Sequence, residues 1–248
     1  MALIRAGSID DFAVEARASL KLEEDISWTK MNKISEIREM TRAVEPTAFE
    51  FATSTEERGL GIKSLLLEKD FDGILGGLFD SNNEIYFVAW AWDLSGEPVY
   101  QYPGKDVNTE DVIIPMKSGV LREFIGEGIN LFPKRLVKGG LGVRIQIWES
   151  DKKSRDFGEV LTQVADSIKK SEINDLLSLI ALTGAPAATI STIAKASLEL
   201  AGIIGAILTA NSNDYVDFFE GYYSADKQWN TGLDNYNGFA SAISLEKF

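Results

Sequence analysis

Two absences limit the side chains that this chain can use for chemistry. Its 248 residues include neither histidine nor cysteine. Imidazole bases, thiol nucleophiles, Ser-His-Asp triads and zinc sites built on His or Cys are therefore excluded. The 38 acidic side chains remain, together with lysines, tyrosines and hydroxyls. The sequence favours a protein without enzymatic activity, and a metal would have to be held by oxygen ligands.

Two short segments resemble parts of a known family. The segment 143–160, VRIQIWESDKKSRDFGEV, is an alternating strand that ends in Trp148 and continues into an acidic loop. It resembles the third calcium-binding loop of C2 domains. The segment 86–98, YFVAWAWDLSGEP, resembles the strand and first loop of the same family. C2 domains are antiparallel β-sandwiches, and many of them bind calcium between loops and then dock on phospholipid.

The resemblance implies a calcium site of four carboxylates. Asp93 would be the first-loop ligand, and Glu149, Asp151 and Asp156 would be third-loop ligands. Calcium suits this set because it takes oxygen ligands at about 2.3–2.6 Å. The family usually has Asp where Glu149 stands, and the second Asp of its first loop is missing here. A solvated acidic loop is the alternative interpretation of the same residues.

Other short motifs lack the context that their chemistry needs. The run Asp70-x-Asp72-Gly73 opens like an EF-hand loop, but no Glu follows at the twelfth position. The Gly139-Gly140-x-Gly142 run lacks the strand and helix of a phosphate-binding loop. Paired carboxylates about 5–9 Å apart could hydrolyse glycosides. A polysaccharide hydrolase is therefore kept as a third and weaker hypothesis.

The overall charge restricts the partners. The net charge is −13 and the pI is about 4.6. An acidic surface repels nucleic acid and does not dock unaided on anionic lipid. The expected partner is therefore a protein or a membrane lipid. The first residues, MALIRAGSIDDF, lack the apolar core of a signal peptide. We expect a cytoplasmic protein, or one exported without a classical signal peptide.

The longest apolar stretch runs from Ile173 to Ala210 and should organise the rest. The run Thr183–Pro186 interrupts it, because Gly ends helices and Pro fits only the first turn of the next one. This pattern predicts a helical hairpin. Lys195 and Glu199 lie inside the longer arm, where each charge would cost about 2.5–3.5 kcal/mol in a membrane. We therefore expect the hairpin to pack as a buried layer, with membrane insertion as the alternative.

Alternating apolar residues predict strands on both sides of the hairpin. The segment 84–93 is apolar on both faces, which predicts a central strand between a facing sheet and a helical layer. A helix is predicted from about 156 to 169, and no prediction is made for 119–138. The predicted strands are 48–52, 62–67, 84–93, 98–102, 111–116, 142–148, 214–223 and 242–246.

The two ends of the chain carry further signals. A capping-box-like start predicts a helix over 8–20, and a stripe of apolar residues closed by Pro46 predicts a second helix over 29–44. Near the C-terminus, Trp229 and Tyr236 lie in the Gly- and Asn-rich stretch QWNTGLDNYNG. We expect these two rings to be the most exposed of the aromatic side chains.

Together these patterns predict an α+β protein. We expect an antiparallel, C2-like β-sandwich over 47–248, with an apolar helical hairpin inserted at about 157–211 and a helical N-terminal extension over 1–46. The first functional hypothesis is a non-enzymatic binding protein that docks on membrane lipid or a protein partner through acidic loops, with Ca²⁺ as its candidate cofactor. The second is a pore-forming or membrane-disrupting, toxin-like protein that uses the 173–210 hairpin.

Overall fold

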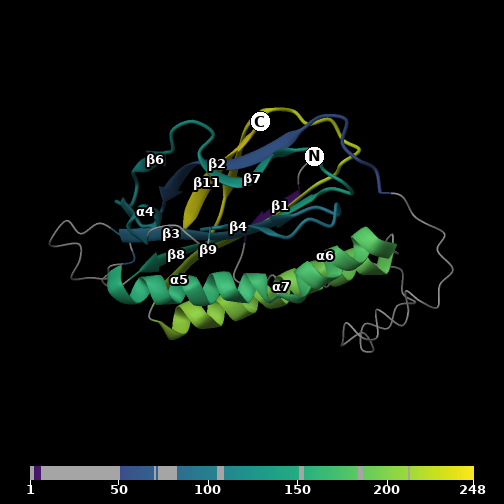
Figure 1. Ribbon diagram of the computed structural model, residues 1–248. Coiled ribbons are helices and arrows are strands. Elements are labelled where there is room, and N and C mark those ends of the chain that lie inside the picture. The colour runs from purple at the N-terminus through teal and green to yellow at the C-terminus, as the bar shows by residue number, and fades with distance from the viewer. Residues whose placement is uncertain are drawn as a thin grey trace.

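A computed structural model describes residues 3–6, 51–69, 71, 83–104, 109–150, 154–183, 187–211 and 213–248. Its strands form two sheets, and every strand pair in these ranges is antiparallel. The three long helices of the described residues lie along one side of the molecule (Figure 1). The structure is thus of the α+β class, with mostly antiparallel sheets.

The helix-side sheet has the order β1-β9-β8-β3-β4, and β5 also pairs with β3. Its strands are β1 (Leu3–Ala6), β3 (Asn83–Trp92), β4 (Tyr100–Tyr102), β5 (Ile114–Met116), β8 (Leu141–Ser150) and β9 (Asn213–Tyr223).

The outer sheet has the order β10-β11-β2-β6, and β7 also pairs with β2. Its strands are β2 (Arg58–Leu67), β6 (Leu121–Glu123), β7 (Ile129–Arg135), β10 (Gly232–Asn237) and β11 (Ser241–Lys247).

The helices confirm the prediction for the middle of the chain. Helix α5 (Ser154–Lys169) leads into a hairpin of α6 (Glu172–Thr183) and α7 (Ala187–Ala210). A short helix, α4 (Thr109–Val112), precedes β5 and was not predicted: it contains the first two residues of the predicted strand 111–116, of which only 114–116 form β5. The hairpin breaks where the Gly-Ala-Pro run was expected to break it. In α7, Ile193, Leu200 and Ile204 are buried, whereas Glu199 is exposed.

Strand β3 separates two hydrophobic cores, as its two apolar faces predicted. Alternate residues of β3 pack with α5, α6 and α7. The residues between them pack with the outer sheet. The first set is Tyr86, Val88, Trp90 and Trp92, and the second is Ile85, Phe87, Ala89 and Ala91.

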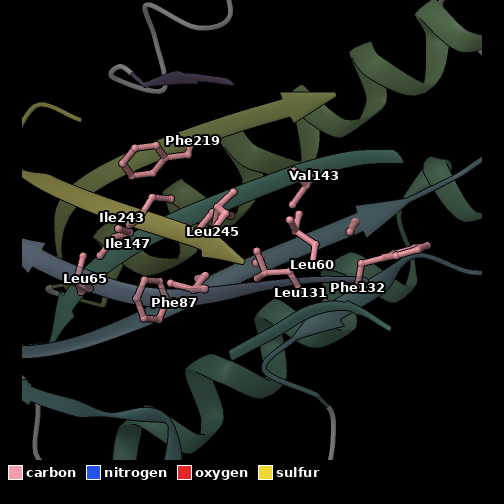
Figure 2. Close-up of a cluster of buried hydrophobic side chains, with 14 of the residues drawn as sticks. Leu60, Leu65, Phe87, Leu131, Phe132, Val143, Ile147, Phe219, Ile243 and Leu245 are labelled. Carbon is pink, nitrogen blue, oxygen red and sulfur yellow. The ribbon is translucent and has the colours of Figure 1, made fainter. Parts of the chain in front are cut away.

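The core between the sheets consists mainly of aliphatic side chains and phenylalanine rings. Figure 2 shows Leu60 and Leu65 of β2 beside Phe87 of β3 and Val143 and Ile147 of β8. Val143, Ile145 and Ile147 share this face of β8, which confirms the predicted alternation. Burial of such side chains contributes about 1.5–3 kcal/mol each and holds the two sheets together.

Several predictions differ from the structure or lie outside it. Residues 3–6, assigned to the N-terminal extension, form strand β1 beside β9, whereas the helices expected over 8–20 and 29–44 lie outside the described residues. In the predicted strand 48–52, Phe51 and Ala52 belong to no strand. Strand β10 was not predicted, because its Gly- and Asn-rich sequence resembles a turn.

The expectation of an exposed Trp229 is wrong. Trp229 is 7% exposed, and its indole Nε1 donates to the carbonyl of Phe248 at 3.1 Å. The Arg58 guanidinium lies 5.3 Å from the ring centroid, and Tyr223 meets the ring edge to face. The C-terminal strand covers this tryptophan, which a polar local sequence could not show. Tyr236 is half-buried.

One buried carboxylate of β9 links the two sheets at the β10–β11 turn. Asp217 of β9 is fully buried. It accepts hydrogen bonds from the backbone amides of Phe239, Ala240 and Ser241 and from the Ser241 hydroxyl, at 2.8–3.1 Å. These donors belong to the β10–β11 turn and the start of β11, so Asp217 fixes the outer sheet to the helix-side sheet.

We expect Asp217→Asn to lower the free energy of unfolding by about 3 kcal/mol, because an amide nitrogen cannot accept from these buried donors. Urea denaturation followed by tryptophan fluorescence would measure the change. Asp214→Asn, at an exposed position of the same strand, should change stability by no more than about 0.5 kcal/mol. Equal stability of D217N and the wild type would show that this carboxylate is not a link.

Candidate functional site

The structure places Asp93 in a structural role at the end of β3. The carboxylate is fully buried. It accepts from the Ser95 hydroxyl at 2.5 Å and from the Lys138 backbone amide at 3.1 Å, and it forms an ion pair with Arg135 at 3.1 Å. Ser95 belongs to the loop after β3, Arg135 is the last residue of β7, and Lys138 lies in the segment after β7. Asp93 therefore holds two loops together.

Glu149 lies near the end of β8 and is also buried, at 2% exposure. The Glu84 amide lies 3.5 Å from its Oε1. Burial raises the pKa of the Tyr86 hydroxyl, and the negative charge of Glu149 raises it further. Glu149 is thus a buried carboxylate at the end of the β3–β8 ladder, paired with Ile85 and close enough to Tyr86 to affect its ionisation.

The predicted four-carboxylate calcium site is not assembled. Trp92 is paired with Gly142 and Ile85 with Glu149, so Asp93 and Glu149 lie at opposite ends of the β3–β8 ladder. Eight residues at about 3.3 Å each separate them by about 25 Å, far beyond the reach of one ion. The assignment of Asp93 to this site is corrected on that ground.

The structure describes little of the other two predicted ligands. Asp151 lies outside the described residues. Asp156 belongs to α5, but its side chain is not among those that the structure describes. Within the described part of the chain, no three acidic side chains gather closely enough to hold a metal ion.

Hydrogen bonds from β3 and β8 to α7 position the hairpin on the sheet. Ser197 of α7 is fully buried, and its Oγ accepts from the Trp90 indole at 2.8 Å and from Arg144 Nε at 2.7 Å. Gln146 Nε2 donates to the Ala201 carbonyl at 3.0 Å, one turn further along α7. Polar groups of β3 and β8 therefore fix the position of the longer arm.

The buried guanidinium of Arg144 is the charged group in these contacts. Arg144 is 1% exposed and forms an ion pair with Glu220 of β9 at 2.6 Å. Its guanidinium carbon also lies 5.6 Å from the Trp92 ring centroid. Burial lowers the pKa of Arg144, and Glu220 partly offsets this by stabilising the charged form. The helical layer thus covers the positive charge of Arg144, which is stable when buried only because Glu220 and Ser197 interact with it.

We expect Ser197→Ala to lower the free energy of unfolding by about 2–4 kcal/mol, because it removes the acceptor that Trp90 and Arg144 share. Ser178→Ala, at an exposed position of α6, is the matched control and should be nearly neutral. Urea denaturation measures both. A loss below about 0.5 kcal/mol in S197A would mean that the hydroxyl does not seat the hairpin.

The structure places the hairpin against the helix-side sheet. None of the helices in the described ranges combines the length and the hydropathy that crossing a bilayer requires. Apolar side chains of the two helices, among them Leu176, Ile193 and Ile204, are buried in the core against the helix-side sheet. The prediction that the hairpin is a helical layer on the sheet is confirmed.

Among the large apolar side chains that the structure describes, the most exposed is Ile125. It lies in a different place, the 117–128 loop, defined as residues 117 to 128. Strands β6 and β7 both pair with β2, with Glu123 opposite Ser64 and Ile129 opposite Ile62. They are two parts of one edge strand, and the chain leaves the edge between them. This loop belongs to the outer sheet, on the side away from the helices (Figure 1).

Three aliphatic side chains of this loop face solvent. Ile125 is 98% exposed, and Val120 and Leu121 are 54% and 55% exposed. Single exposed apolar residues are common on protein surfaces, whereas a local group of them indicates an interaction site. The 117–128 loop is therefore the candidate functional site.

The loop is attached to the sheets through Phe124 and Gly128. The amide of Phe124 donates to the Lys63 carbonyl at 2.8 Å, and the Phe124 ring lies edge to face on Phe87 of the core, 6.1 Å between centroids. Gly128 has a φ of +78°, and a Cβ there would lie 2.1 Å from the Ile62 carbonyl oxygen. Phe124 thus anchors the loop while the next residue, Ile125, projects outward.

Its charges are balanced although the chain is strongly acidic. Lys117 and Arg122 are exposed, as are Glu123 and Glu127. Lys63 lies at its base, where the ammonium donates to the Gly126 carbonyl and lies 3.5 Å from Glu246. The loop therefore presents an apolar surface without a strong local charge.

Sequence reasoning missed this site. The run VLREFI between Gly119 and Gly126 contains the apolar residues and the turn residues, and that was the available signal. The sequence could not show that Phe124 turns inward and Ile125 outward, because the two are neighbours in an irregular segment without a period.

Comparison with known proteins identifies no family. No family model matches the chain, and no curated protein matches it significantly. Among solved structures, human GIVD cytosolic phospholipase A2, in complex with methyl gamma-linolenyl fluorophosphonate and terbium chloride, is similar over 79% of this chain and 17% of its own. The identity is 8% and the TM-score is 0.34, so the likeness establishes neither a shared fold nor a shared function. The fold is described only as α+β with antiparallel sheets.

Proposed function

We propose that this chain is a non-enzymatic binding protein that docks on its partner through the 117–128 loop. The observation that carries the proposal is the 98% exposure of Ile125 at the tip of a loop whose base is tied to β2. When a partner covers an exposed apolar side chain, the free energy of the system decreases. Because backbone hydrogen bonds of Phe124 and Gly128 already constrain the loop, binding requires less further loss of conformational entropy.

The proposal replaces the acidic loops of the C2-like hypothesis with a different docking element. It keeps the idea of an antiparallel sandwich that presents a loop at its edge. Asp93 already accepts hydrogen bonds within the protein, and about 25 Å of the β3–β8 ladder separates it from Glu149. A calcium site involving Glu149, Asp151 and Asp156 remains a separate proposal, and docking through the 117–128 loop does not require it.

The absence of cysteine allows a direct test with a single fluorescent label. Glu127→Cys places an environment-sensitive dye beside Ile125 without removing it, and Glu199→Cys places the same dye on the exposed face of α7. Each labelled protein is mixed in turn with phospholipid vesicles and with a soluble protein extract. We expect a blue shift at position 127 with one of these partners and no shift at position 199.

A competition experiment shows whether the shift reports docking. Excess unlabelled wild type should reverse the shift at position 127, whereas excess unlabelled Ile125→Glu should not, because its tip is charged. The absence of a shift at position 127 with both partners, or a shift at position 199 alone, would overturn the proposal. The second result would favour the helical hairpin as the interacting element.

A further inference from the structure

We propose that the partner of the 117–128 loop is a lipid bilayer with a zwitterionic surface, entered by Val120, Leu121 and Ile125 without calcium. This inference rests on the proposed function, since it names the partner of the same loop. It assigns the contact to the edge of the outer sheet. The acidic loops and the helical hairpin take no part in it.

The shape of the site favours a bilayer over a protein groove. The loop leaves the sheet edge between β6 and β7 and ends in the exposed Ile125, whereas pockets that take up peptides or small ligands are concave. A projecting tip can enter the boundary between headgroups and acyl chains, which apolar side chains reach at a depth of about 5–10 Å. Ile125, the most exposed of the three side chains, would enter furthest.

The side-chain types favour the same partner. Energetically dominant residues at protein interfaces are mostly Trp, Tyr and Arg, whereas Leu and Val are under-represented. The exposed apolar side chains of this loop are one Ile, one Leu and one Val. Its aromatic residue, Phe124, contacts the core residue Phe87 and is not offered to a partner. Aliphatic groups of this kind partition into hydrocarbon without needing a shaped pocket.

The charges select the lipid class. Within the loop, Lys117 and Arg122 balance Glu123 and Glu127, while the whole chain carries −13. An anionic bilayer would repel the chain at distances up to the Debye length of about 8 Å at physiological salt. A zwitterionic surface lacks this repulsion. Binding should therefore be driven by apolar contact, depend little on salt, and weaken when anionic lipid is added.

The same geometry determines which side of the molecule stays in solution. Strand β6 lies on the side of the molecule away from α5, α6 and α7 (Figure 1). Docking by the loop would therefore leave the helical layer in water. Ile203 of α7 is 53% exposed on that layer, so it serves as a matched control for an exposed isoleucine that takes no part.

Vesicle flotation tests the inference with the full-length protein. The wild type is mixed with phosphatidylcholine vesicles, or with vesicles that also contain phosphatidylserine, each with calcium or with a chelator. We expect binding to phosphatidylcholine that is equal with calcium and with chelator, and weaker binding when phosphatidylserine is present. A dye trapped in the vesicles should not leak.

Substitutions then locate the contact. Ile125→Glu and Val120→Glu should each lower the partition coefficient about tenfold or more, because each loses an apolar insertion of at least about 1.4 kcal/mol. Ile203→Glu should bind like the wild type. Thermal unfolding confirms that the variants are folded, which their surface positions favour, and two loop variants guard against the failure of one.

Three results would overturn the inference. They are no flotation with phosphatidylcholine, flotation that requires calcium or phosphatidylserine, and loss of binding in I203E with retention in I125E. The protein could fail to float with vesicles while the dye at position 127 still responds to the protein extract, with only unlabelled wild type reversing that response. In that case the lipid assignment is wrong and the proposed function stands. If the dye also fails to respond, both fall. Leakage that I203E abolishes would assign membrane activity to the hairpin.

Discussion

The helical layer depends on a buried cation that the sheet and α7 share. Arg144 of β8 lies between Trp90 and Glu220 in the strand register, and its Nε donates to Ser197 of α7. A guanidinium removed from water is stable only if its donors have acceptors and its charge has a partner. Ser197 and Glu220 supply these from the helix and from the neighbouring strand. Detaching α7 would remove one of them, so the apolar hairpin and this polar seat form one structural unit.

The two faces of the helix-side sheet use different forces. The face toward the outer sheet is nearly all apolar and is fixed by Asp217 at the β10–β11 turn. The face toward the helices carries Arg144, Gln146 and Trp148 among its apolar residues, and hydrogen bonds set the position of α7. Hydrophobic contact alone is non-directional, whereas these bonds select one position along the helix. The outer sheet keeps an open edge, where the 117–128 loop projects.

The proposed function follows from this division of the structure. The helical layer and the core between the sheets are occupied by internal contacts, and the predicted ligand Asp93 binds loops of its own chain. At the open edge, Phe124 enters the core and Ile125 remains in water. A charge-balanced, apolar tip on an acidic chain is suited to a partner that offers hydrocarbon rather than charge.

The sequence by itself determined the elements whose pattern is periodic and long. The hairpin break at the Gly-Ala-Pro run, the two apolar faces of 84–93 and the alternation of Val143, Ile145 and Ile147 follow from local steric and hydrophobic rules. Strands β6, β7 and β10 were not predicted, because short edge strands have little apolar period. Only the tertiary structure decided that Asp93 and Glu149 lie at opposite ends of a ladder, that Trp229 is covered, and that Ile125 is exposed. Strand register and burial depend on residues far apart in the chain, and no short segment of sequence contains them.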